Sequence, residues 1–200
     1  MSLLVETIKV KDGMAVNMDY HSYRFNKTRK ELFGYGPPVD LQEKIIIPAY
    51  AGKGIFKCRI EYDDHIRKVD FLPYKPKSIR TLKLVEAGGV EYNYKFINRE
   101  GINALLEQKN GCDDILIIKD GRLTDTSYSN IIVRGNDNIW YTPSTYLLRG
   151  TKRENLLNRG VIKEKEITPA GLKRFHELRL INSMLDIDDT DSIAVRGICF

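Results

Sequence analysis

The octapeptide YNYKFINR at residues 92–99 places a single lysine, Lys95, among aromatic and apolar neighbours. A helix is expected directly after it, over 99–108, where Ile102 and Leu105 share one face. A lysine at such a strand-to-helix junction is partly removed from water, and desolvation or nearby positive charge lowers the pKa of an amine. A neutral amine can condense with an aldehyde. A strand-end lysine that reaches out to solvent is the simpler interpretation, and the octapeptide alone leaves both open.

On the C-terminal side of this octapeptide, short apolar runs alternate with turn signals. Pairs such as Asp120-Gly121 are typical of hairpins, and Thr168-Pro169 is a favourable start for a helix. We expect strands over 114–118, 122–126, 130–133 and 139–141, helices over 151–158 and 168–178, and closing strands over 180–187 and 193–199.

On the N-terminal side, two long hairpins and one helix are expected. The stretch 75–78 contains a proline among polar residues and marks a domain boundary near residue 80. The pattern predicts an α+β protein in two lobes, a small N-terminal domain over 1–80 and a larger domain over 81–200 that carries Lys95. The expected elements are a hairpin of 3–10 with 14–18, a helix over 20–33 that ends at Gly34, and a hairpin of 56–62 with 66–72.

Composition limits the possible partners. The 200 residues carry a net charge of +5 with basic residues scattered along the chain, which favours small anions over nucleic acid. Cys58, Cys112 and Cys199 are an odd number at wide spacing, which suits neither a disulfide framework nor a CxxC metal site. We find no signal-peptide pattern and no run of about 18 apolar residues. We therefore expect a cytoplasmic protein with no metal and no membrane partner.

Two segments could bind an anion. Gly150 and Thr151 precede an expected helix, where free backbone N–H groups and the helix dipole favour a phosphate. His21 and Arg24 lie one helical turn apart and can reach the same ligand, and arginine can donate two hydrogen bonds to it at once. A simple helix cap and an exposed surface arginine are the alternatives.

Two further segments are unusually polar between apolar strands. Residues 123–130 contain Asp125 as their only charge and either form a self-satisfied turn or line a pocket. Asn182 and Ser183 interrupt an apolar segment and could contact a ligand or cap the preceding element.

The order and separation of these segments resemble the class IV aminotransferases, the fold type IV enzymes that use pyridoxal 5'-phosphate, especially their aminodeoxychorismate lyase branch. The resemblance covers nearly the whole chain. It implies a two-lobed fold like that of D-amino acid aminotransferase, a homodimer and a small amino substrate. It rests on Val5-Glu6-Thr7, His21 and Arg24, Lys95 to Arg99, Asp125 to Asn130, Thr142-Pro143, Gly150 to Arg153, and Asn182.

By this resemblance, Lys95 is the catalytic residue, which would bind the cofactor covalently and move protons to and from the substrate. Asp125 would stand beside the pyridine nitrogen and keep it protonated, so that the ring can accept electrons. The family usually has glutamate there, and aspartate is shorter by about 1.5 Å of reach. The family also normally has further strands before its Phe-Glu-Thr motif, so we expect a shortened N-terminal lobe.

The resemblance also assigns the phosphate end of the cofactor and the substrate contacts. Arg24 would clamp the phosphate, together with the backbone N–H groups that follow Gly150. Lys152 stands where threonine or a long apolar residue is common, which adds charge and removes a hydroxyl. The remaining expected contacts are Thr151, Asn130 and Ser183 for the cofactor, and Thr7 and Asn182 for the substrate.

The resemblance favours one reaction and leaves alternatives open. Asn182 matches an asparagine of the lyases where many transaminases have glycine, and Thr7 matches a threonine that the lyases place near the substrate. Both favour 4-amino-4-deoxychorismate lyase, which releases 4-aminobenzoate and pyruvate in folate synthesis. A branched-chain or D-amino acid transaminase is the first alternative because the same residues serve both reactions. An inactive homologue with a binding role is the second.

Overall fold

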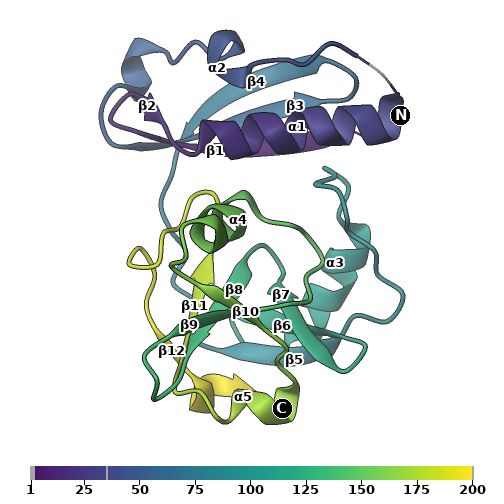
Figure 1. The fold of residues 1–200 in the computed structure, drawn as a ribbon, viewed down its shortest axis with the longest axis vertical. Helices are drawn as coiled ribbons and strands as arrows, with labels where there is room; N and C mark the ends of the chain where they lie inside the picture. Colours follow the sequence, from purple (N-terminus) through teal and green to yellow (C-terminus); the bar gives the residue numbers. More distant parts are fainter. Residues whose placement is uncertain (1–2, 35, 200) are drawn as a thin grey trace. The chain divides into compact units, whose positions relative to one another are not determined.

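The computed structural model describes residues 3–34 and 36–199, which fall into two compact units (Figure 1). The N-terminal unit contains residues 1–75 and 94–98, and the C-terminal unit contains 76–93 and 99–200. The sequence placed the boundary near residue 80, and the structure places it between Lys75 and Pro76. The structure also differs for Lys95, which was expected in the C-terminal domain but belongs to the N-terminal unit.

The N-terminal unit is built on a four-stranded antiparallel sheet in the order β2-β1-β3-β4. Both expected hairpins are present, although the second strand of the first one is short because a helix begins at Met18. Strand β1 pairs with β3 along its whole length, from Leu4 opposite Tyr62 to Lys11 opposite Ile55. The strands are β1 (Leu4–Lys11), β2 (Met14–Ala15), β3 (Ile55–Tyr62) and β4 (Ile66–Pro73).

Helix α1 (Met18–Phe33) packs along this sheet, as Figure 1 shows. Its buried face includes Phe25, whose ring lies 4.4 Å from the ring of Tyr62, and the core continues through buried residues of β1 and β3. The helix ends where the sequence predicts, because Gly34 adopts a φ of 88° that favours glycine. Two short helices follow, α2 (Leu41–Lys44) and η1 (Ala49–Ala51).

The segment that carries Lys95 joins this sheet at β1. The N–H of Val5 donates to the carbonyl of Lys95 at 2.9 Å, and the N–H of Ile97 donates to the carbonyl of Leu3 at 2.9 Å. Leu4 and Phe96 form an antiparallel bridge. These backbone bonds explain why the lysine groups with the N-terminal unit although its neighbours in sequence do not.

The C-terminal unit is a mixed sheet that has nine strands among the described residues. Its main path runs β10-β9-β8-β7-β6-β5-β13, and β11 pairs with both β8 and β12. The hairpins β6–β7 and β8–β9 are those that the sequence predicts, whereas β5 was not expected. The strands are β5 (Leu82–Glu86), β6 (Asp114–Lys119), β7 (Arg122–Thr126), β8 (Asn130–Arg134), β9 (Trp140–Pro143), β10 (Lys163–Lys165), β11 (Glu177–Ile181), β12 (Ile193–Ala194) and β13 (Ile198–Cys199).

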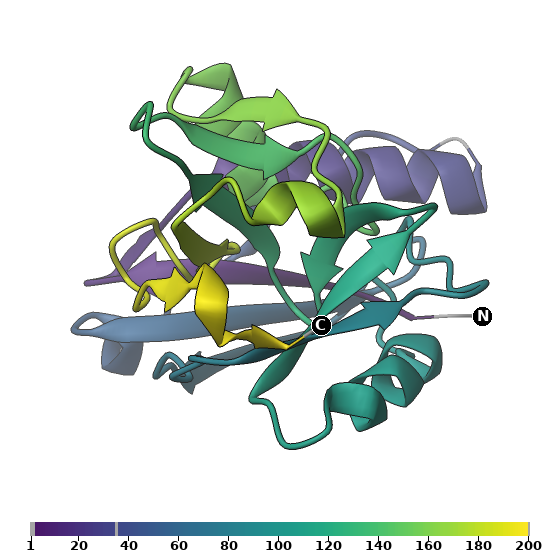
Figure 2. The ribbon, with the colours of Figure 1, turned by 90° about the horizontal axis from the view of Figure 1, so that it is seen from below.

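Short helices connect and flank these strands. In Figure 2, α3 (teal) and α5 (green) lie on opposite sides of the strands of this unit. The helices expected at 99–108 and 151–158 are confirmed, the first of them ending in a 3₁₀ turn. The helices are α3 (Glu100–Leu106), η2 (Glu107–Lys109), α4 (Thr151–Asn158), α5 (Pro169–Leu172) and η3 (Val195–Gly197).

Three expectations near the C-terminal end were wrong. The closing strand predicted over 180–187 does not extend past Ile181, where β11 ends, because residues 182–185 form a turn. The helix predicted over 168–178 stops at Leu172, and Glu177–Ile181 forms strand β11 instead, because Leu178 and Leu180 are buried where β11 pairs with β8. The strand predicted over 193–199 is broken by η3. In the part of the chain that is described, no helix has the length and apolar character needed to cross a bilayer.

Candidate active site

A buried carboxylate organises the expected residues of the N-terminal unit. Glu6, on β1, is fully buried. Arg24 donates to it through Nε at 2.7 Å and through Nη2 at 2.6 Å, and Nδ1 of His21 lies 2.6 Å from Oε2. His21 and Arg24 thus reach the same group, as their spacing on α1 predicts, and within the chain that group is Glu6.

The charges in this cluster balance one another. Burial alone would raise the pKa of Glu6, but the charge of Arg24 and hydrogen bonds from His21 and Arg24 lower it to about 2. Burial lowers the pKa of His21, and its contacts with Glu6 oppose this effect. Near neutral pH the cluster therefore holds an anionic Glu6, a cationic Arg24 and a neutral His21. The neutral ring is assigned its proton on Nδ1, where it can donate to Glu6.

Lys95 belongs to the same unit and interacts with this cluster. Its carbonyl accepts from Val5, the residue before Glu6, and its side chain is half-buried. After burial and Arg24, the charge of Lys95 is a further influence that lowers the pKa of His21. A half-buried amine within electrostatic range of fixed charges is the environment that the sequence predicts for Lys95.

The second group of expected residues lies around Asp125 in the C-terminal unit. Asp125 on β7 and Asn130 on β8 stand opposite each other in register. Nδ2 of Asn130 donates to Oδ1 of Asp125 at 2.7 Å and to the carbonyl of Leu148 at 3.1 Å. The N–H groups of Leu147 and Leu148 donate to Oδ2 of Asp125, both at 2.9 Å. These bonds attach the loop that leads into α4 to the ends of β7 and β8.

The chemistry of Asp125 fits a pyridine nitrogen. A carboxylate offers about four lone-pair positions, and three N–H donors of this chain use three of them, which leaves one on Oδ1. Burial raises the pKa of Asp125 to about 6, against the effect of its hydrogen bonds. A protonated ring nitrogen at Oδ1 would favour the charged carboxylate. The shorter side chain is therefore compatible with the expected role.

Glycine is required at position 150, where α4 begins. A Cβ on Gly150 would overlap Oδ1 of Asn130, so the backbone passes this amide at a distance that only glycine allows. Gly150 is the N-cap and supplies no side-chain cap to the first turn. An anion would complement the N–H groups of such a helix start. The loop geometry thus fits the expected phosphate end of the cofactor.

The two cations that follow Gly150 have partners within the chain. The buried Lys152 forms an ion pair with Asp186, so its ammonium group is already neutralised. Arg153 is also buried; its Nη2 donates to the carbonyl of Pro143 at 2.9 Å and to Glu164 at 2.5 Å. These contacts give Arg153 a structural role at the base of α4 that the sequence analysis did not foresee.

Asn182 is held in a turn beside the Asp125 group. Its Oδ1 accepts from the N–H groups of Met184 and Leu185, and its Nδ2 donates to Oγ of Ser129 at 2.9 Å. Ser183 is half-buried in the same turn. Thr7, in contrast, lies on β1 in the N-terminal unit, half-buried and opposite Arg59 of β3. The structure thus brings Asn182 close to residues 125–130, whereas Thr7 lies in the N-terminal unit, which also contains Glu6 and Lys95.

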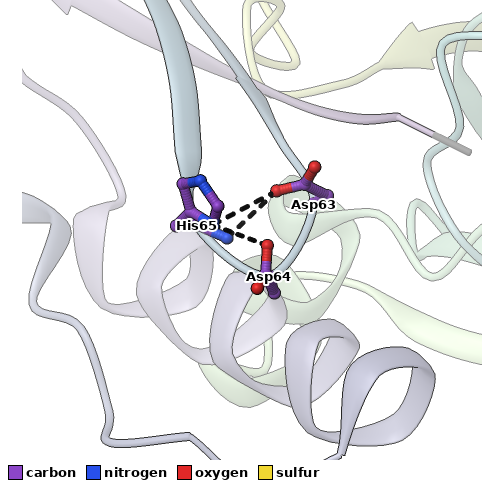
Figure 3. A group of neighbouring side chains, drawn as sticks. All are labelled: Asp63, Asp64 and His65. Atoms are coloured by element: carbon purple, nitrogen blue, oxygen red, sulfur yellow. Dashed lines mark hydrogen bonds and ion pairs between the residues drawn. The ribbon is translucent and has the colours of Figure 1, made fainter. Parts of the chain in front are cut away.

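A separate acidic group lies in the β3–β4 turn, where Asp63, Asp64 and His65 point toward one another (Figure 3). Arg67 donates to both oxygens of Asp63 at 2.9 and 2.8 Å, and Nδ1 of His65 lies 2.6 Å from Asp64. The Arg67 hydrogen bonds hold the pKa of Asp63 well below its usual range. Side chains of the turn balance these charges, and we assign no ligand to it.

Comparison with known proteins identifies the family of this chain. Residues 61–190 match the family of amino-transferase class IV. An uncharacterized protein of Haemophilus influenzae is 35% identical over 183 residues, which are 90% of this chain and 97% of that protein. The chain belongs to the class IV aminotransferase family. Class IV aminotransferases depend on pyridoxal 5'-phosphate, and the fold is the type IV fold that the resemblance implied.

Solved structures of other proteins share the fold. The crystal structure of a proposed 4-amino-4-deoxychorismate lyase from Haemophilus somnus 129PT has 37% identity and a TM-score of 0.85, with 92% of this chain and 97% of that chain covered. A hypothetical aminotransferase from Mycobacterium tuberculosis in its PLP-bound form has a TM-score of 0.75 at 18% identity, with 98% and 81% covered. At this low identity the second likeness shows the fold alone.

Proposed function

We propose that this class IV protein is a 4-amino-4-deoxychorismate lyase that uses pyridoxal 5'-phosphate and forms 4-aminobenzoate and pyruvate. The observation that carries the proposal is Asn182, whose amide is fixed by two backbone donors and by Ser129 beside Asp125. The transaminases with glycine at this position would lack that amide. The likeness to the Haemophilus somnus protein supports the same reaction.

The cofactor, when bound, would supply an electron-accepting ring. Asp125 would keep the ring nitrogen protonated. The positive charge of that nitrogen would in turn stabilise the ionised form of the Asp125 carboxylate, which burial disfavours. Arg24 and the N–H groups that follow Gly150 would bind the phosphate. Because Glu6 holds the guanidinium through two of its nitrogens, Arg24 would meet the phosphate in a fixed orientation.

Lys95 would do the proton chemistry. Its amine would remove the proton from Cα of the substrate, the bond between the ring and the enolpyruvyl oxygen would break, and the ring would become aromatic. Lys95 would then protonate the methylene carbon of the departing enolpyruvate, which becomes pyruvate. The Glu6 cluster would place fixed charges within electrostatic range of this half-buried amine, since the charge of Lys95 acts on the pKa of His21. In a transaminase, the same amine would return its proton to the cofactor instead. The two reactions therefore differ in where one proton goes.

Covalent labelling tests the role of Lys95. Wild-type protein incubated with the cofactor should turn yellow, and borohydride should fix the label to the peptide that contains Lys95. A Lys95→Ala variant should stay colourless after dialysis, whereas Lys57→Ala, at another half-buried lysine of the same unit, should label like the wild type. A wild-type protein that remains colourless would favour the inactive homologue.

Product analysis distinguishes the reactions. With 4-amino-4-deoxychorismate, a lyase releases 4-aminobenzoate, which is fluorescent, together with pyruvate. With paired amino and keto acids, a transaminase exchanges amino groups and releases no 4-aminobenzoate. We further propose a cytoplasmic homodimer, as the family resemblance implies, and sedimentation velocity of the loaded protein would test the dimer.

A further inference from the structure

Two cysteines that are far apart in sequence meet in the C-terminal unit. Sγ of Cys112 lies 3.3 Å from Sγ of Cys199, although 87 positions separate them. Cys199 is exposed, whereas Cys112 has only 7% of its surface exposed. A disulfide bond needs the two sulfurs at about 2.05 Å, so the sulfurs would have to approach each other by roughly 1.3 Å.

Strand β5 and its neighbours hold this thiol pair in place. Cys112 ends the turn before β6, and its N–H donates to the carbonyl of Lys109 at 2.9 Å. The next residue, Asp113, accepts from the N–H groups of Arg80 and Thr81 just before β5. Cys199 lies on β13, which pairs with β5 on the side away from β6. The two thiols therefore come from the segments on either side of β5.

We propose that Cys112 and Cys199 form a reversible disulfide, which makes this pair a modification site for low-molecular-weight disulfides such as oxidised glutathione. In a reducing compartment, the disulfide would form when oxidised glutathione accumulates and would be reduced when reduced glutathione returns. Closure would fasten β13, which lies at the end of the strand order and, among the described residues, pairs with β5 at Ile198 with Leu82 and at Cys199 with Lys83.

The difference in exposure determines which of the two thiols reacts first. The exposed Cys199 attacks one sulfur of the small disulfide as a thiolate, forms a mixed disulfide and releases one small thiol. Cys112 then loses its proton to solvent, attacks the sulfur of Cys199 and expels the second small thiol. One disulfide is reduced to two thiols while two cysteines are oxidised to one disulfide. The hydrogen bond to Cys199 raises the pKa of the Cys112 thiol, which agrees with Cys199 reacting first.

The test uses the full wild-type chain. It is incubated with oxidised glutathione, quenched with an alkylating agent and digested without reduction for mass spectrometry. We expect one linked peptide pair that joins Cys112 to Cys199, reversal by dithiothreitol, and Cys58 alkylated only after denaturation because it is fully buried. The crosslink should raise Tm by roughly 5–15 °C, since it closes a long loop in the unfolded chain.

Variants separate the two steps. Cys112→Ala should stop at a glutathione adduct on Cys199, Cys199→Ser should leave the buried Cys112 unmodified, and the control Cys58→Ala should form the same disulfide as the wild type. Three results in the wild type would overturn the proposal: a lasting adduct on Cys199, a disulfide between Cys199 residues of two molecules, or both thiols still open to alkylation. Because these readouts require no cofactor, they do not depend on the proposed reaction.

Discussion

At the scale of single residues, Glu6 should be the most sensitive position of the N-terminal unit. In Glu6→Gln, the largely buried Arg24 loses its counter-charge, and breaking a buried pair in this way costs about 3–5 kcal/mol. Urea unfolding monitored by circular dichroism would measure the loss. Glu61→Gln is the matched control, because Glu61 pairs with Arg59 near the surface and should change stability by less than about 1 kcal/mol. Equal losses in both variants would contradict this account.

Asp125 offers a second residue-scale prediction. Replacing it with the glutamate usual in the family adds a methylene to a buried site whose carboxylate already accepts three hydrogen bonds, so Asp125→Glu should lower the free energy of unfolding by about 1–3 kcal/mol. The exposed Asp137→Glu should have little effect. Chemical denaturation would contradict this prediction if Asp125→Glu were as stable as the wild type. The loop at Leu147 and Leu148 would then adapt to the longer side chain, and the site would not be specific for aspartate.

The site residues show how far sequence reasoning reaches. Lys95, Asp125 and Gly150 could be selected because motif order identifies them without knowledge of their contacts. The role of Glu6 could not be predicted in this way, because its partners His21 and Arg24 lie on α1, which reaches β1 only in the folded chain. The ion pair between Lys152 and Asp186 joins residues 34 positions apart and was equally hidden.

At the scale of elements, local patterns predicted hairpins well and failed where tertiary pairing decided the outcome. Asp12-Gly13 and Asp120-Gly121 fix their turns locally, since both aspartates and both glycines adopt positive φ. The helix start signal Thr168-Pro169 lies upstream of Glu177–Ile181, yet this segment forms β11 because it pairs with β8 at five residues. Burial between strands outweighs the weak helix preference there.

Gly150→Ala tests the close approach between the loop and β8. The new Cβ would displace the side chain of Asn130 and weaken its bonds to Asp125 and Leu148, so we expect a loss of roughly 2–4 kcal/mol. Gly89→Ala is the control because it is exposed with open space around it. In the background of Asn130→Ala, Gly150→Ala should cost clearly less, and a double-mutant cycle measures this coupling. Strict additivity would show that the overlap does not matter.

At the scale of the whole molecule, the two units should respond to acid in opposite directions between pH 7 and pH 5. The pKa of His21 is lowered by burial, so its contribution to stability is present above its unfolded value of 6.5 and is lost as the pH falls. The pKa of Asp125 is raised from 3.8 to about 6, so its ionisation destabilises the fold at pH 7, and this cost decreases as the pH falls below 6 and is gone below 3.8. One unit loses stability where the other gains it.

Hydrogen exchange followed by mass spectrometry resolves the two responses, after correction for the intrinsic effect of pH on exchange. On going from pH 7 to pH 5, peptides of β1 and α1 should lose protection, while peptides that cover β7, β8 and the start of α4 should gain it. His21→Gln, which keeps an N–H donor for Glu6, should abolish the response of the first group and leave the second unchanged. A parallel change in both groups would mean that a single global transition, and not these two buried groups, governs the pH dependence of stability.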